Sequence, residues 1–195
     1  YFNSLIFLKK LVKNNFFGKI YYVNIDACSN LVNWRKNIHY SKSASSMKKY
    51  GGGALLELSH ELDFSIYLLG DLNPSKSMKK KLSDLNINVE DIYEFSGFNK
   101  NKTYFDISAN FFSKNKAREI IIEGKNLSIK ADLIKNEMKI IENNKEKKIK
   151  LKKFNINKTY SMEHNELISG KLNRACTLIE GKKVLKLIEK INKLS

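Results

Sequence analysis

Residues 51–64 read Gly-Gly-Gly-Ala-Leu-Leu-Glu-Leu-Ser-His-Glu-Leu-Asp-Phe, and this stretch decides the fold. Three consecutive glycines do not belong to regular structure, because they let the backbone turn and approach other groups closely. The residues that follow predict a helix ending near Gly70, since apolar side chains recur at three- and four-residue spacing. These side chains form one stripe of Leu55, Leu58, Leu62, Ile66 and Leu69. A glycine turn that opens an amphipathic helix is therefore the predicted centre of the domain.

The opposite side of this predicted helix carries Glu57, His60, Phe64 and Tyr67. Glu57 lies one turn before His60, and Asp63 lies one turn after it. An imidazole beside a carboxylate can transfer protons near neutral pH, although such a histidine can equally be a solvated structural residue. A metal site fits less well, because the Glu-x-x-His spacing of carboxylate-bridged metal pairs needs a second copy that the sequence lacks. We therefore expect a proton-transfer site or a structural histidine here, and no metal.

Length and composition indicate one globular domain. The 195 residues suffice for a real core, and 42% of them are hydrophobic, which is too many for a disordered chain. The formal net charge of +16 suggests nucleic acid, but it comes almost entirely from lysine. Specific readers of bases and phosphates usually rely on arginine, and AT-rich codons explain a surplus of lysine, asparagine and isoleucine. We expect no specific nucleic-acid partner and keep a basic nucleic-acid binder as a remote alternative.

Two further features bear on the location of the protein. No apolar run approaches the roughly 20 residues that span a bilayer, so we expect no membrane partner. Cys28 and Cys176 form no metal-binding spacing and are typical of a reducing compartment, so we expect a cytoplasmic protein. The chain begins at Tyr1 rather than at methionine, and we expect an upstream part to be missing.

The sequence then predicts helices at both ends and strands between them. Helical spacing covers 1–17 and 160–172, and a capping box at Thr177–Glu180 opens a last amphipathic helix. Alternating or β-branched patterns predict strands at 19–29, 89–98, 103–112, 119–123, 127–133, 138–141 and 148–154, with a short strand inside 71–88. Short turns imply antiparallel neighbours.

We therefore predict one α+β domain over residues 1–195. Its core is an open, mostly antiparallel or mixed β-sheet of about six strands with helices on one face. The other face is the expected surface for homo-oligomer formation, because Tyr93, Phe95 and Tyr104 would otherwise lie partly exposed there. Residues 31–50 follow neither period, and a loop of this length is usually functional or mobile.

These features resemble the C-terminal domain of the glucose–fructose oxidoreductase, inositol dehydrogenase and rhizopine-catabolism (Gfo/Idh/MocA) family. The glycine turn, Glu57, His60 and Asp63 match its typical motif, and the Ser-His-Glu-Leu-Asp run at 59–63 resembles members acting on bacterial surface sugars. The resemblance implies the substrate-binding part of an NAD(P)-dependent oxidoreductase acting on a sugar or nucleotide sugar. A missing N-terminal Rossmann domain would bind NAD or NADP and supply a catalytic lysine, since this chain has no G-x-G-x-x-G fingerprint.

The resemblance also implies roles for single residues. His60 is the expected catalytic acid/base or hydrogen-bond partner of the reacting hydroxyl, and Glu57 is expected to orient it. The expected substrate-binding residues are Glu57, Trp34, Arg35, Tyr40, Lys42 and Asp63, although Trp34 can equally close the edge of the core.

Three departures from the family pattern keep a non-catalytic binding or scaffold domain as the alternative. Ser4-Leu5-Ile6 stands where many relatives carry Arg-Phe-His, and Ser41 stands where an arginine is common. Glu57 precedes His60 by three positions, whereas the acidic residue of many relatives precedes the histidine by four.

Overall fold

A computed structural model describes residues 3–151, 155–170 and 175–195 of the chain. The ends of three predicted elements, at residues 1–2, 152–154 and 171–172, lie outside these ranges. One sheet has the strand order β2-β3-β4-β1-β5-β6-β7-β8. Its strands are β1 (Ile20–Cys28), β2 (Leu72–Lys80), β3 (Ile92–Asn99), β4 (Tyr104–Asn110), β5 (Ala117–Gly124), β6 (Leu127–Asp132), β7 (Glu137–Glu142) and β8 (Lys145–Lys150). The α-helices are α1 (Asn3–Lys13), α2 (Ala54–Glu57), α3 (Ser59–Leu69), α4 (Ile156–Ser169) and α5 (Leu178–Leu194).

The predicted α+β class is confirmed, but the sheet has eight strands rather than about six. Each of the eight strands overlaps a segment for which the sequence predicts a strand, so only the total of about six is wrong, and the two edge strands have the weakest patterns. β2 contains Pro74 and several lysines, and β8 reads Lys-Glu-Lys-Lys-Ile-Lys, so neither shows the apolar alternation of an inner strand. Proline and lysine are tolerated at a sheet edge because one side of an edge strand needs no partner. The sheet is mixed, since β1 and β4 are parallel and the other neighbours are antiparallel.

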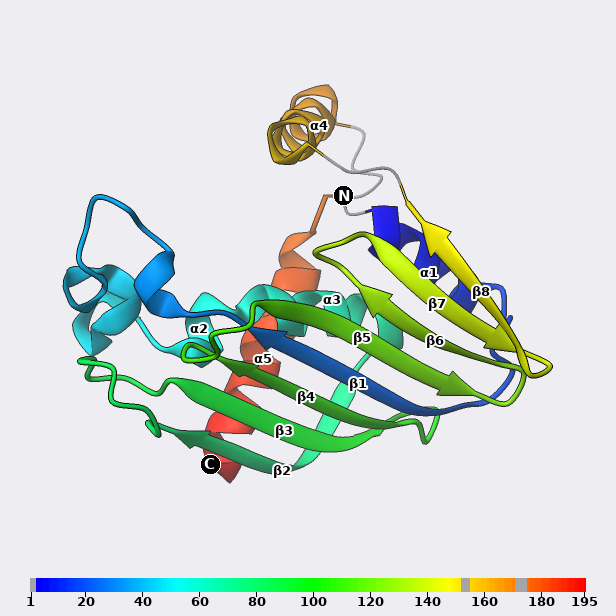
Figure 1. Ribbon diagram of the computed structural model, residues 1–195, viewed down its shortest axis with the longest axis horizontal. Coiled ribbons are helices and arrows are strands. Elements are labelled where there is room, and N and C mark those ends of the chain that lie inside the picture. Colours follow the sequence, from blue (N-terminus) through cyan, green and yellow to red (C-terminus); the bar gives the residue numbers. More distant parts are fainter. Residues whose placement is uncertain (1–2, 152–154, 171–174) are drawn as a thin grey trace.

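The helices cover one face of this sheet. Figure 1 shows α1, α3 and α5 behind the strands, while no helix of the described ranges crosses the front face. Residues that alternate along the inner strands point to the helices, and Ile25, Ile107 and Ile120 are completely buried. Tyr93 and Phe95 are buried on this inner side as well, so their predicted place on the open face is wrong. The register pairs Tyr93 with Ala109 and Phe95 with Ile107, which fixes both rings beneath the helices.

The glycine turn is required by close packing. A Cβ on Gly52 would lie 2.5 Å from the carbonyl oxygen of Ala44, and one on Gly53 would lie 2.4 Å from Oε1 of Glu90. Gly53 also has a φ of +114°, which side chains rarely adopt. The turn therefore sits against the loop before it and against the start of β3, and it fixes where α2 begins.

The predicted single helix after the turn is divided in two. Leu58 has φ −102° and ψ 23°, so α2 ends at Glu57 and α3 begins at Ser59. The carbonyl of Leu58 accepts a hydrogen bond from the hydroxyl of the buried Tyr93 at 3.4 Å, which supports the break. α3 packs against α1, α5 and β1 together, so it buries more than one stripe. Phe64, predicted on the polar side, is consequently buried and only 5% exposed.

The C-terminal helices differ from each other. α5 begins with the predicted capping box, in which Thr177 and Glu180 each bind the backbone of the other. α5 packs on β2 and α3, whereas α4 projects from the body next to the N-terminal end of the described chain (Figure 1). Within the described ranges, no helix has both the length and the apolar composition needed to cross a membrane.

Candidate functional site

His60 lies in the first turn of α3, and 54% of its side chain is exposed. The exposed side of α3 also carries Asp63 and Tyr67, as the sequence predicts. Nε2 of His60 lies 3.1 Å from Oε1 of Glu61, the next residue along the helix. The imidazole is thus open to solvent on one side and held by a carboxylate on the other.

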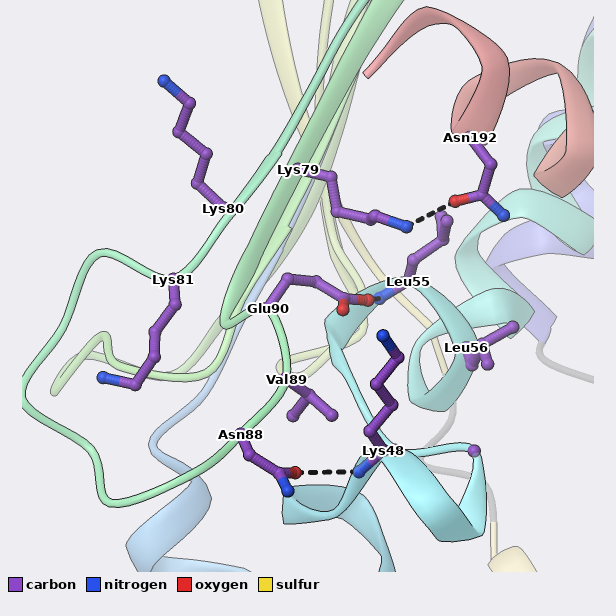
Figure 2. Close-up of a pocket in the computed structure, with 12 residues that line it drawn as sticks. Lys48, Leu55, Leu56, Lys79, Lys80, Lys81, Asn88, Val89, Glu90 and Asn192 are labelled. Atoms are coloured by element: carbon purple, nitrogen blue, oxygen red, sulfur yellow. Dashed lines mark hydrogen bonds between the residues drawn. The ribbon is translucent and has the colours of Figure 1, made fainter.

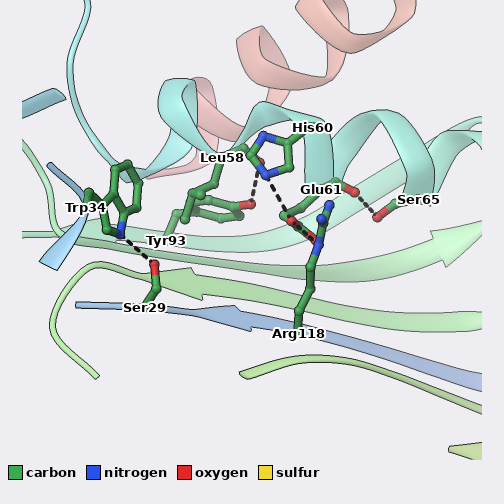
Figure 3. A network of polar contacts seen from close by, with 8 residues as sticks. All are labelled: Ser29, Trp34, Leu58, His60, Glu61, Ser65, Tyr93 and Arg118. Atoms are coloured by element: carbon green, nitrogen blue, oxygen red, sulfur yellow. Dashed lines mark hydrogen bonds and ion pairs between the residues drawn. The ribbon is translucent and has the colours of Figure 1, made fainter. Parts of the chain in front are cut away.

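Glu61 is the feature of the site that the sequence analysis missed. Its side chain is only 1% exposed, and the same Oε1 that faces His60 lies 2.8 Å from Nε of Arg118. Figure 3 shows Glu61 pointing from α3 and Arg118 reaching from β5, so that their charged ends meet between helix and sheet. The guanidinium of Arg118 also lies over the ring of Phe64, 5.3 Å from its centroid. A buried carboxylate needs such a partner, because burial of an unpaired charge is strongly unfavourable.

Tyr93 belongs to the same buried cluster. Burial raises the pKa of the Tyr93 hydroxyl well above its ordinary value, the negative charge of Glu61 adds to this shift, and Arg118 opposes it. Tyr93 is therefore a neutral donor at physiological pH, and its hydrogen bond to Leu58 holds the helix break in place. The break, the tyrosine and the ion pair together determine where His60 emerges from the helix.

Glu57 has a different environment from the one expected. It is the last residue of α2, on the other side of the break at Leu58, and it is half-buried. Among the contacts of the described residues, none joins Glu57 to His60, and the carboxylate against the imidazole is that of Glu61. The one-turn spacing of Glu57 and His60 assumed a continuous helix, which the structure does not have.

Asp63 interacts with His60 through charge rather than through a hydrogen bond. Surrounding protein atoms raise the pKa of Asp63 by hindering its hydration, and the negative charge of Glu180 raises it further. The nearby His60 partly offsets both effects. Asp63 is thus close enough to His60 to influence charge at the site.

Three of the residues predicted from the loop 31–50 make contacts within the loop or with the segments next to it. Nε1 of Trp34 donates to Oγ of Ser29 at 2.8 Å, and its ring meets Phe111 edge-on with centroids 5.1 Å apart, so Trp34 closes the edge of the core. Nη1 of Arg35 donates to Oγ of Ser45 at 3.2 Å.

The other two loop residues lie in the second of four short 3-10 turns, Tyr40–Lys42. The hydroxyl of Tyr40 accepts from the backbone N–H of Asn86 at 3.2 Å, and Lys42 is exposed. No contact of the described residues joins any of these four side chains to His60, and Figure 3 shows the Tyr93 ring between Trp34 and the imidazole.

The ionisable groups in contact at this site are one ion pair and one exposed imidazole. Among the described residues, no group of three or more His, Cys, Asp and Glu side chains could hold a metal ion. Arg118, whose side chain is 21% exposed, balances the charge of the buried Glu61 beneath the exposed imidazole. Sequence alone could have suggested Arg118, because it is one of only three arginines in a lysine-rich chain.

Comparison with known proteins identifies the family. Residues 9–192 match the oxidoreductase family, C-terminal alpha/beta domain, and the chain therefore belongs to the Gfo/Idh/MocA oxidoreductases. A search of curated proteins found no match.

Solved structures share the fold at low sequence identity. An NAD binding oxidoreductase from Klebsiella pneumoniae has a TM-score of 0.80 at 13% identity, covering 100% of this chain and 62% of its own. The WlbA dehydrogenase from Bordetella pertussis, in complex with NADH and UDP-GlcNAcA, has a TM-score of 0.74 at 18% identity, covering 98% and 57%. A super-repressor mutant of Gal80p from Saccharomyces cerevisiae has a TM-score of 0.77 at 15% identity, covering 98% and 60%. The chain thus spans about 60% of the length of these proteins.

Proposed function

We propose that this chain is the substrate-binding, C-terminal part of an NAD(P)-dependent oxidoreductase that acts on a sugar or nucleotide sugar. Membership of the oxidoreductase family supports the reaction class, and the WlbA complex with NADH and UDP-GlcNAcA supports the cofactor and substrate class. The observation in this chain that carries the proposal is the exposed imidazole of His60 on the buried Glu61–Arg118 pair.

His60 contributes the proton step of this reaction. Oxidation of a hydroxyl-bearing carbon releases a hydride, which a nicotinamide accepts when bound, and a proton, which needs a base near neutral pKa. Because Nε2 faces Glu61, the lone pair that accepts the hydroxyl proton lies on Nδ1. Glu61 then stabilises the imidazolium through its contact with Nε2, and the rigid pair with Arg118 keeps the ring in position.

The remaining expected site residues have supporting roles in the proposal. Asp63 lies near His60 and contacts the sugar or tunes the charge of the imidazole. Trp34, Arg35, Tyr40 and Lys42 shape the sugar pocket through the loop that they hold together.

The nicotinamide cofactor does not fit the residues of this chain. The sequence has no G-x-G-x-x-G fingerprint, and the described sheet has one parallel pair of strands rather than the doubly wound arrangement that binds dinucleotides. In the proposal, a Rossmann domain that leads into the 1–17 helix binds NAD or NADP and supplies the catalytic lysine.

Exposed apolar side chains on α4 and α5 support the presence of a further domain. Ile168 of α4 is 84% exposed, and Leu178 and Ile179 of α5 are 76% and 73% exposed. Figure 1 shows α4 and the start of α5 near the N-terminal end of the described chain, where a preceding domain would be attached. Apolar surface of this kind is typical of an interface.

We also propose that the open sheet face forms a homo-oligomer. Tyr104 stacks on Tyr22 with ring centroids 6.1 Å apart and meets Phe98 at 5.1 Å, and Phe98 is 52% exposed. This aromatic cluster takes the place of the one expected from Tyr93 and Phe95. Light scattering after size exclusion tests it, and a monomer at high concentration would count against the interface.

The alternative is a binding or regulatory domain without catalysis. The fold is shared with Gal80p, which was solved as a super-repressor mutant. The same architecture therefore also occurs in a protein described by repression rather than by dehydrogenase activity. The departures at Ser4-Leu5-Ile6 and Ser41 are compatible with lost activity. A full-length protein that binds a nucleotide sugar without turning it over with either dinucleotide would favour this alternative.

The test uses the full-length protein with NAD or NADP and a panel of UDP-sugars. His60→Ala and His60→Asn should lower kcat by about a hundredfold or more if His60 transfers the proton. His164→Asn is the matched control, because His164 is an exposed histidine on α4 and should leave kcat unchanged. Turnover within a few-fold of wild type in folded His60 variants would show that His60 is structural.

A further inference from the structure

A cavity of about 540 Å³ opens beside the glycine turn, between the end of β2, the start of β3 and the last turn of α5. Its lining includes Lys48, Lys79, Lys80, Lys81, Glu90 and Asn192. The lining of this cavity includes none of the candidate sugar-binding residues. It also includes neither Glu61 nor Arg118. Its volume falls within the range of roughly 300–1,000 Å³ that is usual for small-molecule sites.

The charge of this cavity is unbalanced. It has four lysines and one glutamate, and none of the ion pairs formed by the described residues involves any of them. Two of the ammonium groups bind neutral oxygens instead: Lys79 donates to the side chain of Asn192 and Lys81 to the carbonyl of Ser83. The local field is therefore positive, whereas seven lysines elsewhere in the described residues pair with carboxylates.

The single carboxylate has a structural role. Oε1 of Glu90 accepts a hydrogen bond from the backbone N–H of Leu55 at 3.2 Å. The backbone carbonyl of Glu90 accepts another from the backbone N–H of Ala54 at 3.1 Å. Glu90 thus satisfies the first N–H groups of α2, which Gly53 cannot cap. Figure 2 shows its carboxylate against Leu55, with Lys79 on one side and Lys48 on the other.

Two asparagines add donors to the cavity. Oδ1 of Asn88 accepts from the backbone N–H of Lys48 at 2.8 Å, and Oδ1 of Asn192 accepts from Lys79. Because each side-chain oxygen is used, each NH₂ group can donate to a ligand. Ammonium and amide donors around one hollow are the groups that bind phosphate oxygens.

We propose that this cavity binds a small molecule that carries a diphosphate group. Lys48 and Lys79 hold the anion, Lys80 and Lys81 add positive charge at the rim, and Leu55 and Val89 line the floor. The size of the cavity suits a small anion rather than a nucleic-acid duplex, which needs an extended row of phosphate contacts. The site is separate from His60 and does not depend on the oxidoreductase proposal.

Calorimetric titration of the full protein with pyrophosphate tests this site at about 150 mM salt, where the Debye length is roughly 8 Å and distant charges are screened. Lys48→Gln/Lys79→Gln should weaken binding at least about tenfold, because each lysine contributes a charge-assisted hydrogen bond. Lys145→Gln/Lys147→Gln on β8 is the matched control, since it removes the same charge from exposed lysines and should change the Kd less than about twofold. His60→Ala should leave binding unchanged.

A parallel titration with uridine diphosphate identifies the source of the diphosphate. If uridine diphosphate binds more tightly than pyrophosphate, the ligand is a nucleotide whose base or ribose contacts Leu55 and Val89. If the two bind equally, the ligand is the inorganic anion. Both results support the site. Equal weakening by the two lysine pairs would show a nonspecific effect of net charge. Such equal weakening would overturn the proposal. So would loss of pyrophosphate binding in His60→Ala, or the absence of saturable binding by the wild-type protein. Thermal melts of each variant show whether the fold is retained.

Discussion

Glu61 lies within α3 and Glu90 contacts the start of α2, and the surroundings of the two carboxylates differ. Glu61 is buried and pairs with Arg118 at 2.8 Å, beneath the exposed imidazole of His60. Glu90 is half-buried and binds backbone N–H groups of α2, and among the described residues it forms no ion pair with the lysines near it. The same residue type therefore supports proton chemistry at one place and leaves a surplus of positive charge at the other.

The largest effect is expected where the charge is buried. Arg118→Leu leaves the Glu61 carboxylate without its partner and should lower the free energy of unfolding by about 3 kcal/mol. Glu61→Leu/Arg118→Leu should recover much of this loss, because no unpaired charge remains. Urea denaturation measures both. Lys130→Leu, which removes the exposed partner of Glu119, is the control and should change stability by less than about 1 kcal/mol. An equally small effect of Arg118→Leu would contradict the buried pair.

A smaller effect is expected beside Glu90. Gly53→Ala introduces a Cβ only 2.4 Å from Oε1 of Glu90 and strains a backbone with φ +114° and ψ 154°. Gly70 has a similarly unusual φ of +77° and ψ of −159°, but a Cβ there meets nothing within 4 Å. Gly70→Ala should therefore report the backbone strain alone, about 1–3 kcal/mol.

Thermal denaturation should show Gly53→Ala to be the less stable of the two variants by about 1 kcal/mol, the size of an overpacking effect. Adding Glu90→Ala to both backgrounds sharpens the test. The added change should remove the difference between the glycine variants, and a difference that persists would mean that Glu90 does not pack against Gly53.

Much of the fold was predictable because local patterns and global structure agree. The alternation Phe105, Ile107, Ala109 in β4 and the Thr177–Glu180 capping box each describe contacts made within one element. The glycine turn was recognisable because no other residue fits positions that the backbone of the neighbouring loop approaches so closely. The family resemblance added the expected role of His60, which stays a prediction.

The rest depended on contacts between distant segments. The break at Leu58 relies on Tyr93 from β3, and no signal in the helix itself marks it. The prediction assumed a continuous helix with one buried stripe, so it placed Phe64 on the polar side and Glu57 beside His60. No local pattern distinguishes Glu61, because only the fold brings Arg118 to it from β5.

The partner of His60 is the central claim, and NMR of the imidazole nitrogens in the full protein tests it most directly. His60→Asn assigns the signals, since it removes them while His39 and His164 remain. Glu61→Gln should shift the His60 ring nitrogens and change the tautomer populations, because Nε2 loses its charged acceptor at 3.1 Å. Glu57→Gln should leave them unchanged. Signals that move in Glu57→Gln and stay fixed in Glu61→Gln would contradict the account.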